Sequence, residues 1–274
     1  MQKQELYIIK IGGNVIDHPE KLEAFLKDFS EIQKPKILVH GGGKLATKLA
    51  EKLEIPQEFF EGRRITNEET RDVAVMVYAG LINKNIVAQL QSLGTQAMGL
   101  TGADANLIKA HKRVPASVDY GFVGDIDEVN VSMINHLLQQ KTSLVIAPIT
   151  HDGNGQLFNT NADTIASAVA VAMSSLYETR LVYCFEKKGV LKDINDDNSV
   201  VREIKANEFE GLKADGTVAG GMIPKLHNAF EAINKGVTAV YIGKADELGE
   251  LANAFNLMAE QVHATQLELE HKVI

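Results

Sequence analysis

The chain has 274 residues, 45% of them hydrophobic, which is enough to bury a sizeable core in one large domain or two lobes. Its 36 acidic and 28 basic residues give a net charge of −8 without a strong basic cluster, so we expect no nucleic-acid partner. A single cysteine, Cys184, and a start without a cleavable leader predict a cytoplasmic protein that has no internal disulfide.

Short β-branched runs bounded by glycine, proline or polar residues predict buried strands. These runs are Leu6 to Ile11, Lys36 to Val39, Leu144 to Ala147, Arg180 to Tyr183 and Thr238 to Ile242. Apolar residues at helical spacing between them predict helices. Two examples are the set Leu22, Phe25, Leu26, Phe29 and the set Val73, Val77, Leu81, Ile82. Strands alternating with helices predict an α/β fold with a mainly parallel central sheet and helices on both faces.

Two lysine pairs and the longest apolar run are considered as possible contacts with nucleic acid and with a membrane. The pairs Lys34 with Lys36 and Lys187 with Lys188 are interpreted as solvated surface. The longest apolar run, Ile165 to Met173, is much shorter than the roughly 20 residues that span a bilayer, so no transmembrane helix is expected.

The first predicted strand ends in Lys10, Ile11, Gly12 and Gly13. In an open parallel sheet, ligands bind beyond the carboxyl ends of the strands. Consecutive amides at glycines able to adopt positive φ can hold an anion beside the lysine. An ordinary turn with a surface lysine explains the same residues equally well.

The second predicted strand ends in His40, followed by Gly41, Gly42, Gly43 and Lys44, and a helix is predicted from there onward. Three adjacent glycines permit close approach of a ligand, and free amides at a helix start favour phosphate or carboxylate. A merely permissive turn is the alternative, and His40 is expected to be structural. The chain has neither the GxxxxGK[ST] nor the GxGxxG nucleotide motif.

Two further segments carry polar groups. Arg63 and Arg64 can hold a carboxylate in a bidentate pair, although an exposed pair is the simpler interpretation. The run Asn159 to Asp163 precedes a small-residue helix, Ile165 to Ala172, and an N-cap requires only one of its polar residues. Lys225 follows a second glycine turn near a helix start, where a nearby anion would favour it.

The runs KIGG, HGGGK, GRRIT, NTNAD and GGMIPK, in this order, resemble the amino-acid kinase family and, within it, the acetylglutamate kinases. The resemblance extends from about Ile8 to about Gly243 and includes GLTGADANLIKA and YGFVGDI. It implies a three-layer αβα sandwich of the carbamate-kinase-like fold, formed by one domain over residues 1–274. Approximate lobes are residues 1–150 for the acylated amino acid and dimer contact, and residues 151–274 for ATP. The lobe boundary is expected near His151 to Gly155.

The resemblance also implies roles for individual residues. Lys10 and Lys225 would stabilise the transferred phosphoryl group, and Asp163 would orient both lysines. Gly12, Gly13 and Gly43 would hold phosphate oxygens, and Gly220 and Gly221 would lie at the ATP site. Gly42 and Gly43 would contact the substrate, Arg64 would pair with its α-carboxylate, and Asn159 would bond near its acylated amino group.

The implied reaction is ATP-dependent phosphorylation of the γ-carboxylate of N-acetyl-L-glutamate, the second step of arginine biosynthesis. A carboxylate is already ionised at pH 7, so the reaction depends on positioning of the two substrates and on screening of their negative charges more than on a general base. ATP would bring Mg²⁺, held by phosphates and water without protein ligands. In the family that the chain resembles, members inhibited by arginine generally carry an additional helix before the first strand. Only about five residues precede that strand here, so the resemblance implies an arginine-insensitive homodimer.

Some features stay open. Phe185 and Glu186 stand where the family has a small hydroxyl residue and an aspartate, and the tail from Val262 to Ile274 is assigned no function. Acetyl is the default acyl group. Succinyl would need a cation such as Arg71 or Lys84 to pair with its extra carboxylate.

The residues that distinguish acyl groups are expected around Tyr120 to Val123 and in the helix from Asn67 to Leu81. Other functions remain as alternatives: a glutamate 5-kinase, carbamate kinase or aspartokinase, a non-catalytic amino-acid sensor, and a nucleotide-cofactor oxidoreductase. The runs GRRIT and NTNAD argue against the sister kinases. The Lys10, Asp163 and Lys225 set argues against a sensor.

Overall fold

The computed structural model describes residues 3–60, 63–115, 118–185, 196, 199–201, 211, 222–245 and 248, without the side chains of residues 185 and 222–225. The strands are β1 Glu5–Ile11, β2 Lys36–His40, β3 Glu58–Phe60, β4 Arg63–Ile65, β5 Ala97–Leu100, β6 Ile108–Lys112, β7 Gly124–Val129, β8 Ser143–Ile146, β9 Ile149–His151, β10 Leu157–Asn159, β11 Glu178–Phe185 and β12 Ala239–Lys244. The helices are α1 Gly13–Ile16, α2 Pro19–Glu31, α3 Gly43–Lys52, α4 Glu68–Val75, η1 Met76–Ile82, α5 Asn83–Ser92, η2 Asp104–Asn106, α6 Val131–Gln139, α7 Ala162–Met173 and α9 Met222–Asn234.

A six-stranded sheet in the order β12-β11-β1-β2-β8-β5 forms the centre of the fold, and its neighbouring strands are all parallel. All five predicted strands belong to it, so the predicted α/β class is confirmed. Strand β5 was not predicted. Its sequence, Ala-Met-Gly-Leu, lacks β-branched residues and contains a glycine, which is disfavoured in strands.

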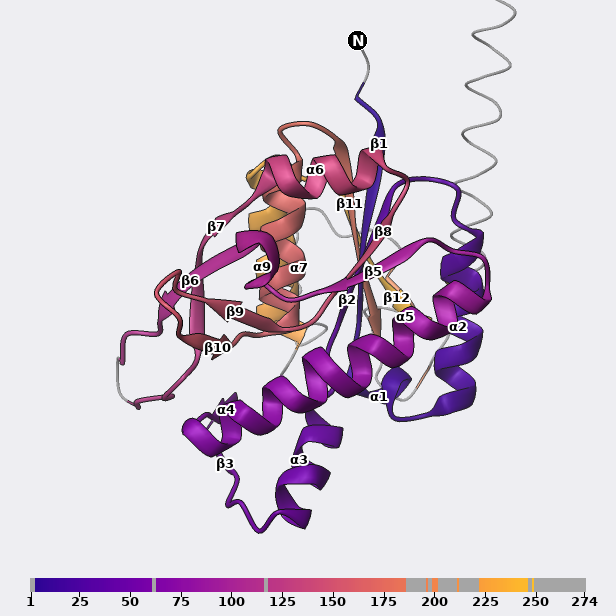
Figure 1. Cartoon of the computed structure of the whole chain (residues 1–274). Helices are drawn as coiled ribbons and strands as arrows, with labels where there is room; N and C mark the ends of the chain where they lie inside the picture. Colours follow the sequence, from indigo (N-terminus) through magenta and orange to yellow (C-terminus); the bar gives the residue numbers. More distant parts are fainter. Residues whose placement is uncertain are drawn as a thin grey trace, which may run out of the picture.

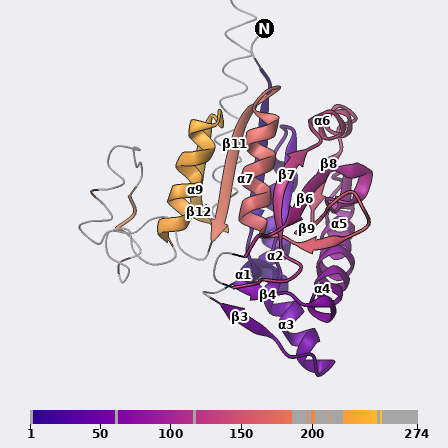
Figure 2. The same cartoon turned by 90° about the vertical axis from the view of Figure 1, so that its left-hand side faces the viewer.

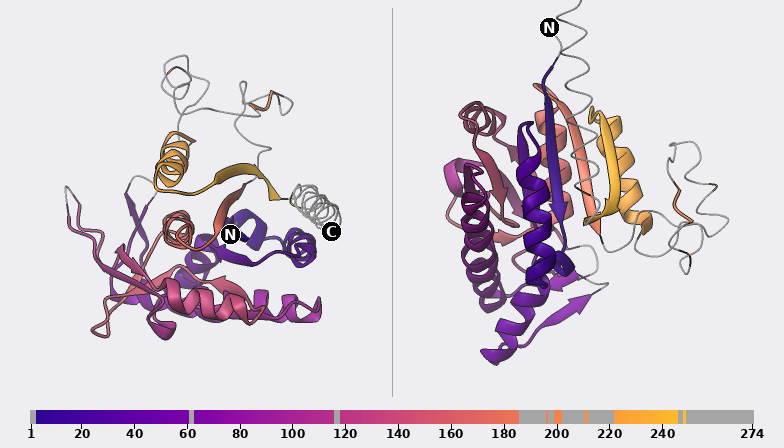
Figure 3. Two further views of the ribbon diagram at one scale, coloured as in Figure 1. Left: turned by 90° about the horizontal axis from the view of Figure 1, so that it is seen from above. Right: turned by 90° about the vertical axis from the view of Figure 1, so that its right-hand side faces the viewer.

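Alternate residues of β1 pack into two separate cores. Leu6 and Ile8 belong to one core, with residues of α6, α7 and α9, whereas Tyr7 and Ile9 belong to the other, with residues of α2, α4 and α5. Successive strand side chains point to opposite faces, so each core fills one face of the sheet. Figure 2 shows α7 and α9 on one side, and the right-hand view of Figure 3 shows the opposite side. The result is the predicted three-layer sandwich.

Two small sheets lie beside the central sheet. One has the order β10-β9-β6-β7, and the other is the β3–β4 hairpin. Bridges pair Thr66 with Gly121 and Val123 with Asn159. Figure 1 shows strands β9 and β10 and the hairpin toward the end of the molecule to which β1 and β2 run. These sheets therefore border the carboxyl ends of the central strands.

One continuous helix, from Glu68 to Ser92, contains a π-helical segment, η1. In a π-helix the i→i+5 bonds widen the turn. The turn after Val77 therefore returns to the core at Ile82, which is buried, and Leu81 is 54% exposed. The set Val73, Val77, Leu81 and Ile82 does lie in a helix, as predicted, but Leu81 stands outside its buried face for this reason. By length and hydropathy alone this helix is long enough to cross a membrane, but seven of its residues lie in the core, as in a core helix.

Lys36 corrects a second expectation. It is only 5% exposed, and its ammonium donates to the carbonyl oxygens of Phe29, Ser30 and Ile32 at 2.7, 3.0 and 2.9 Å. Burial lowers the pKa of Lys36 to about 8. The side chain therefore satisfies the carbonyl groups at the end of α2 and is not solvated surface. Lys187 and Lys188 lie outside the described residues.

Candidate active site

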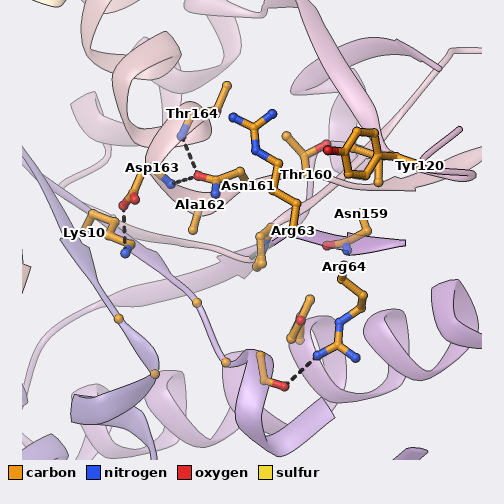
Figure 4. Close-up of a pocket in the computed structure, with 18 of the residues that line it drawn as sticks. Lys10, Arg63, Arg64, Tyr120, Asn159, Thr160, Asn161, Ala162, Asp163 and Thr164 are labelled. Atoms are coloured by element: carbon orange, nitrogen blue, oxygen red, sulfur yellow. Dashed lines mark hydrogen bonds and ion pairs between the residues drawn. The ribbon is translucent and has the colours of Figure 1, made fainter. Parts of the chain in front are cut away.

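A cavity of about 480 Å³ lies beyond the carboxyl ends of the central strands. Its wall is formed by residues of β1, the turn between β2 and α3, the β3–β4 hairpin, η1, the β10-β9-β6-β7 sheet with its loops, α7 and α9 (Figure 4). The predicted site residues that line it are Lys10, Gly12, Gly13, Gly42, Gly43, Arg64, Asn159 and Asp163. They come from segments up to about 150 positions apart in the chain, and the fold brings them to one place.

An ion pair joins the two sides of the cavity. The Lys10 ammonium lies 2.7 Å from Asp163 Oδ1, and both side chains are largely buried. Lys10 is the second-last residue of β1, and Asp163 stands in the first turn of α7. A lysine held by one carboxylate at a cavity wall presents a fixed positive charge to an anionic ligand.

Two glycine turns form the floor below this pair. Gly12 precedes α1 and Gly42 precedes α3, and the Gly41 amide donates to the Ile11 carbonyl oxygen at 3.0 Å, which ties the turns together. Gly12 has φ −92°, and Gly13 is the first residue of α1, so neither uses the positive φ that glycine permits. Gly42 does, with φ 142°, and a Cβ there would overlap Cδ1 of Ile82. The glycine requirement is therefore strongest at Gly42.

His40 supports the second glycine turn from below. It is fully buried, its Nδ1 lies 2.8 Å from the Gly41 carbonyl oxygen, and its Nε2 lies 3.3 Å from Asn83 Nδ2. The carbonyl must accept, so Nδ1 carries the proton and Nε2 accepts from Asn83. Burial lowers the pKa of His40 to about 4. As expected, His40 is structural, and it connects the turn to α5.

The buried neutral state of His40 makes stability depend on pH. Between pH 6.5 and 4 the unfolded chain protonates His40 and the folded protein does not, so the free energy of unfolding falls as pH falls. We expect this group to contribute about 3 kcal/mol across that window. Urea unfolding at several pH values should give a flatter curve for His40→Gln than for the parent, whereas the exposed control His18→Gln should keep the parent's slope. Parallel curves for His40→Gln and the parent would contradict the assignment.

Arg64 is held by several groups that sequence reasoning missed. Its guanidinium donates to Gln57 Oε1, to the Gly43 carbonyl oxygen at 3.0 Å and to Thr47 Oγ1 at 2.8 Å. It also lies over the Phe59 ring, 4.8 Å from the centroid. These contacts fix the guanidinium beside the second glycine turn before any ligand binds. Only the glycine carbonyl could have been anticipated, since Gln57, Thr47 and Phe59 carry no motif of their own.

Tyr78 is a second pocket residue that was not singled out. It is buried in η1 and lines the cavity, where the charge of Arg64 acts on its hydroxyl. Burial raises the pKa of its hydroxyl, against the charge of Arg64. The helix in which it stands was expected to contribute pocket residues.

The polar residues of the run from Asn159 to Asp163 make different contacts. Asn159 Nδ2 donates to Thr66 Oγ1 at 3.1 Å, and Thr160 Oγ1 lies 2.7 Å from Thr150 Oγ1 in the interior. Asn161 caps α7, because its Oδ1 accepts from the amides of Asp163 and Thr164 at 2.8 and 3.2 Å. One residue is therefore the N-cap, and Asn159 and Asp163 reach the cavity.

Some predicted site residues cannot be placed. Gly220, Gly221, Glu186 and the tail from Val262 lie outside the described residues, as do the side chains of Phe185 and Lys225. The backbone of Lys225 is in α9, as predicted, and Asn228 of the same helix lines the cavity. Among the residues that the structure describes, no three histidine, cysteine, aspartate or glutamate side chains form a metal-binding group.

The fold is that of a known class. The model of the amino acid kinase family matches residues 5–244, so the chain belongs to the amino acid kinase family. The acetylglutamate kinase of Cytophaga hutchinsonii is 54% identical to it over 251 residues, which cover 91% of this chain and 95% of that protein.

Solved structures agree with this assignment. A crystal structure from Streptococcus mutans is 28% identical, with a TM-score of 0.72, and the match covers 87% of this chain and 94% of the other. Carbamate kinase from Giardia lamblia, bound to AMP-PNP, has a TM-score of 0.66 at 14% identity, over 92% of this chain and 96% of that one. The second likeness concerns the fold alone, and it confirms the predicted carbamate-kinase-like architecture.

Proposed function

We propose that the protein transfers the γ-phosphoryl group of ATP to the γ-carboxylate of N-acetyl-L-glutamate, giving the acyl phosphate and ADP, as in arginine biosynthesis. The observation that carries the proposal is the convergence of the Lys10–Asp163 pair, two glycine turns and a preorganised Arg64 on one cavity. Relatives about half identical over nearly the whole chain carry the name acetylglutamate kinase, which supports the same reaction here.

The proposed reaction is an in-line displacement. A γ-carboxylate oxygen of the substrate attacks the γ-phosphorus, and the bond from that phosphorus to the bridging oxygen breaks as ADP leaves. Lys10 stabilises charge on the transferred group, and Asp163 holds Lys10 in place. Amides of Gly12, Gly13 and Gly43 bind phosphate and carboxylate oxygens at the two turns. No general base is required, because the nucleophile is already an anion.

Lys225 and the substrate contacts complete the assignment. Lys225 precedes Asn228 by three residues in α9, so the two positions share a helix face, and Asn228 lines the cavity. Arg64 pairs with the α-carboxylate, Gly42 contacts the substrate, and Asn159 bonds near the acylated nitrogen. Apart from Asn159, the contacts to the acylated amino acid come from residues 1–150, whereas residues 151–274, with Gly220 and Gly221, bind ATP. Mg²⁺ enters with ATP, held by phosphates and water.

A cytoplasmic homodimer is part of the proposal. Strand β5 is an edge of the central sheet, and exposed apolar side chains lie on it and on the long helix beside it. They are Met76, Leu81, Leu93 and Met98, each between 41% and 54% exposed. Exposed apolar side chains beside an open sheet edge favour pairing with a second copy. Light scattering should give twice the mass of the chain, and Leu81→Glu should shift it toward the monomer. A monomeric parent protein would refute the dimer.

The experiment that tests the function is ADP release by the purified protein with Mg·ATP and one acceptor at a time. Turnover with N-acetyl-L-glutamate, and not with free glutamate, aspartate or carbamate, is the expected result. Turnover only with a free amino acid or carbamate would reassign the protein to a sister kinase. Binding of an amino acid without ADP release from any acceptor would favour the sensor.

A further inference from the structure

Four cationic side chains line the described part of the cavity, and three of them have assigned partners. Lys10 pairs with Asp163, Arg64 is held by Gly43, Thr47 and Gln57, and Arg113 forms a bidentate pair with Asp125 at 2.6 to 3.2 Å. Arg63 is the fourth. Among the described residues, no hydrogen-bond acceptor, carboxylate or aromatic ring contacts its guanidinium. Within the described part of the chain, the cavity therefore holds one positive charge without a counter-charge or hydrogen-bond partner.

Arg63 and Arg64 serve opposite sides of the cavity. Successive residues of a strand point to opposite faces, and Figure 4 shows the two guanidinium groups leaving β4 in different directions. Arg64 stacks on Phe59, its partner across the hairpin. Arg63 is opposite Phe60, whose ring contacts the edge of Tyr120 at 6.4 Å between centroids. Arg63 thus belongs to the Tyr120 side, where Arg113 also lies over the Tyr120 ring.

If the protein has the proposed function, on which this step rests, the acyl chain of the bound substrate extends toward the Tyr120 side of the cavity. With the γ-carboxylate at Lys10 and the α-carboxylate at Arg64, the acylated nitrogen lies near Asn159. Asn159 pairs with Val123, and its amide donates to the Phe122 carbonyl oxygen at 2.9 Å. An acyl group that extends from the nitrogen along this strand end runs toward Tyr120 and Arg63. An acetyl group ends in a methyl and offers the guanidinium nothing to bind.

We infer that Arg63 forms a subsite for a carboxylate at the far end of the acyl group, so that the protein favours N-acyl-glutamates whose acyl group is a dicarboxylic acid, such as succinyl. A guanidinium meets a carboxylate in paired, charge-assisted hydrogen bonds, which select the anion over a neutral group of the same shape. Arg63 itself is exposed, and at such a site a charged hydrogen-bonded contact is worth about tenfold in affinity.

The cations named from the sequence for this role are engaged elsewhere. Arg71 binds Asp72 at 2.8 Å and Glu68 at 3.2 Å, and it stacks on Phe122. Lys84 donates to Asn83 Oδ1 and to the Gly99 carbonyl oxygen. Neither lines the cavity. Of the cations considered for an extra carboxylate, Arg63 is therefore better placed than Arg71 or Lys84.

The test compares two acceptors that differ only in one charge: N-succinyl-L-glutamate and its terminal amide, N-succinamoyl-L-glutamate. The kcat/KM of the parent should be at least about tenfold higher for the acid. Arg63→Gln should bring this ratio close to one, mainly through KM, and Arg63→Lys should keep part of it because the charge remains without the planar fork. Lys112→Gln, which removes a nearby cation that does not line the cavity, should keep the parent ratio.

Calorimetry of both ligands without nucleotide separates this inference from the proposed function. Tighter binding of the acid that depends on Arg63, without turnover of any acceptor, would refute the kinase reaction and leave the subsite standing. Equal binding and turnover of acid and amide would overturn the subsite. So would a ratio that Arg63→Gln leaves unchanged, or an effect of Arg63→Gln on the KM for ATP alone, which would place Arg63 at the nucleotide.

Discussion

Lys10→Met is expected to lower kcat by about a thousandfold while the protein stays folded. The lysine is buried, 8% exposed, and its ammonium is fixed 2.7 Å from Asp163 at the cavity wall. A charge held in place before the reaction stabilises the transferred phosphoryl group without reorganisation, and removal of one such group commonly costs 10²- to 10³-fold. Methionine keeps most of the buried side-chain volume. The measurement is steady-state ADP release with saturating substrates.

A matched lysine is available as the control for this variant. Lys44 stands in the first turn of α3, its side chain is 67% exposed, and it does not line the cavity. Lys44→Met should stay within about twofold of the parent kcat. A double-mutant cycle with Asp163→Asn should be strongly non-additive, because the carboxylate acts through the lysine. A near-normal kcat for Lys10→Met would remove Lys10 from the reaction.

Arg64→Gln should raise the KM for the acylated glutamate by about a hundredfold and change kcat much less. The guanidinium is already oriented by a backbone carbonyl, two side chains and an aromatic ring, so little freedom is lost when a carboxylate binds. Loss of a charged hydrogen-bonded pair costs up to about 3 kcal/mol, which corresponds to about a hundredfold. Initial rates across a range of substrate concentrations give both constants.

The KM for ATP serves as the control measurement for the Arg64→Gln variant. It should change little in Arg64→Gln, because Arg64 contacts the second glycine turn and the hairpin, away from α7 and α9. Arg64→Lys should recover only part of the affinity, since one ammonium cannot replace the planar fork. Equal increases in the KM of both substrates would indicate a general distortion of the cavity and contradict the assignment.

Strands and turns of the fold could be predicted because their signals are local. Five β-branched runs identified five of the six central strands, and the glycine runs after β1 and β2 marked two sides of the cavity. Strand β5 was not predicted, because Ala97–Leu100 pairs through its backbone and contains no β-branched residue. Its place is fixed by its neighbour β8 and by the long helix that packs on it.

The rest of the site depends on contacts between distant residues, which single-sequence patterns do not contain. Gln57 and Thr47 bind Arg64 from two separate segments, and Tyr78 lines the same cavity; each alone is an ordinary polar residue. Lys36 looked like surface because lysine usually is, yet a helix end lies within reach of its ammonium. The Lys10–Asp163 contact agrees with the predicted pairing, whereas the catalytic roles of both residues remain predictions.

The π-helical segment η1 changes which side chains of the long helix face the core before and after it. Tyr78, in the π-helical segment, lines the cavity together with Arg64. One turn later, Asn83 contacts His40 beneath the glycine turn and donates to the carbonyl of Val145 in the sheet. A regular α-helix of the same residues would bring Leu81 to the core in place of Ile82 and rotate one half away from its partners. The number of residues in this segment, more than the identity of its exposed side chains, thus sets the alignment between the substrate wall and the sheet.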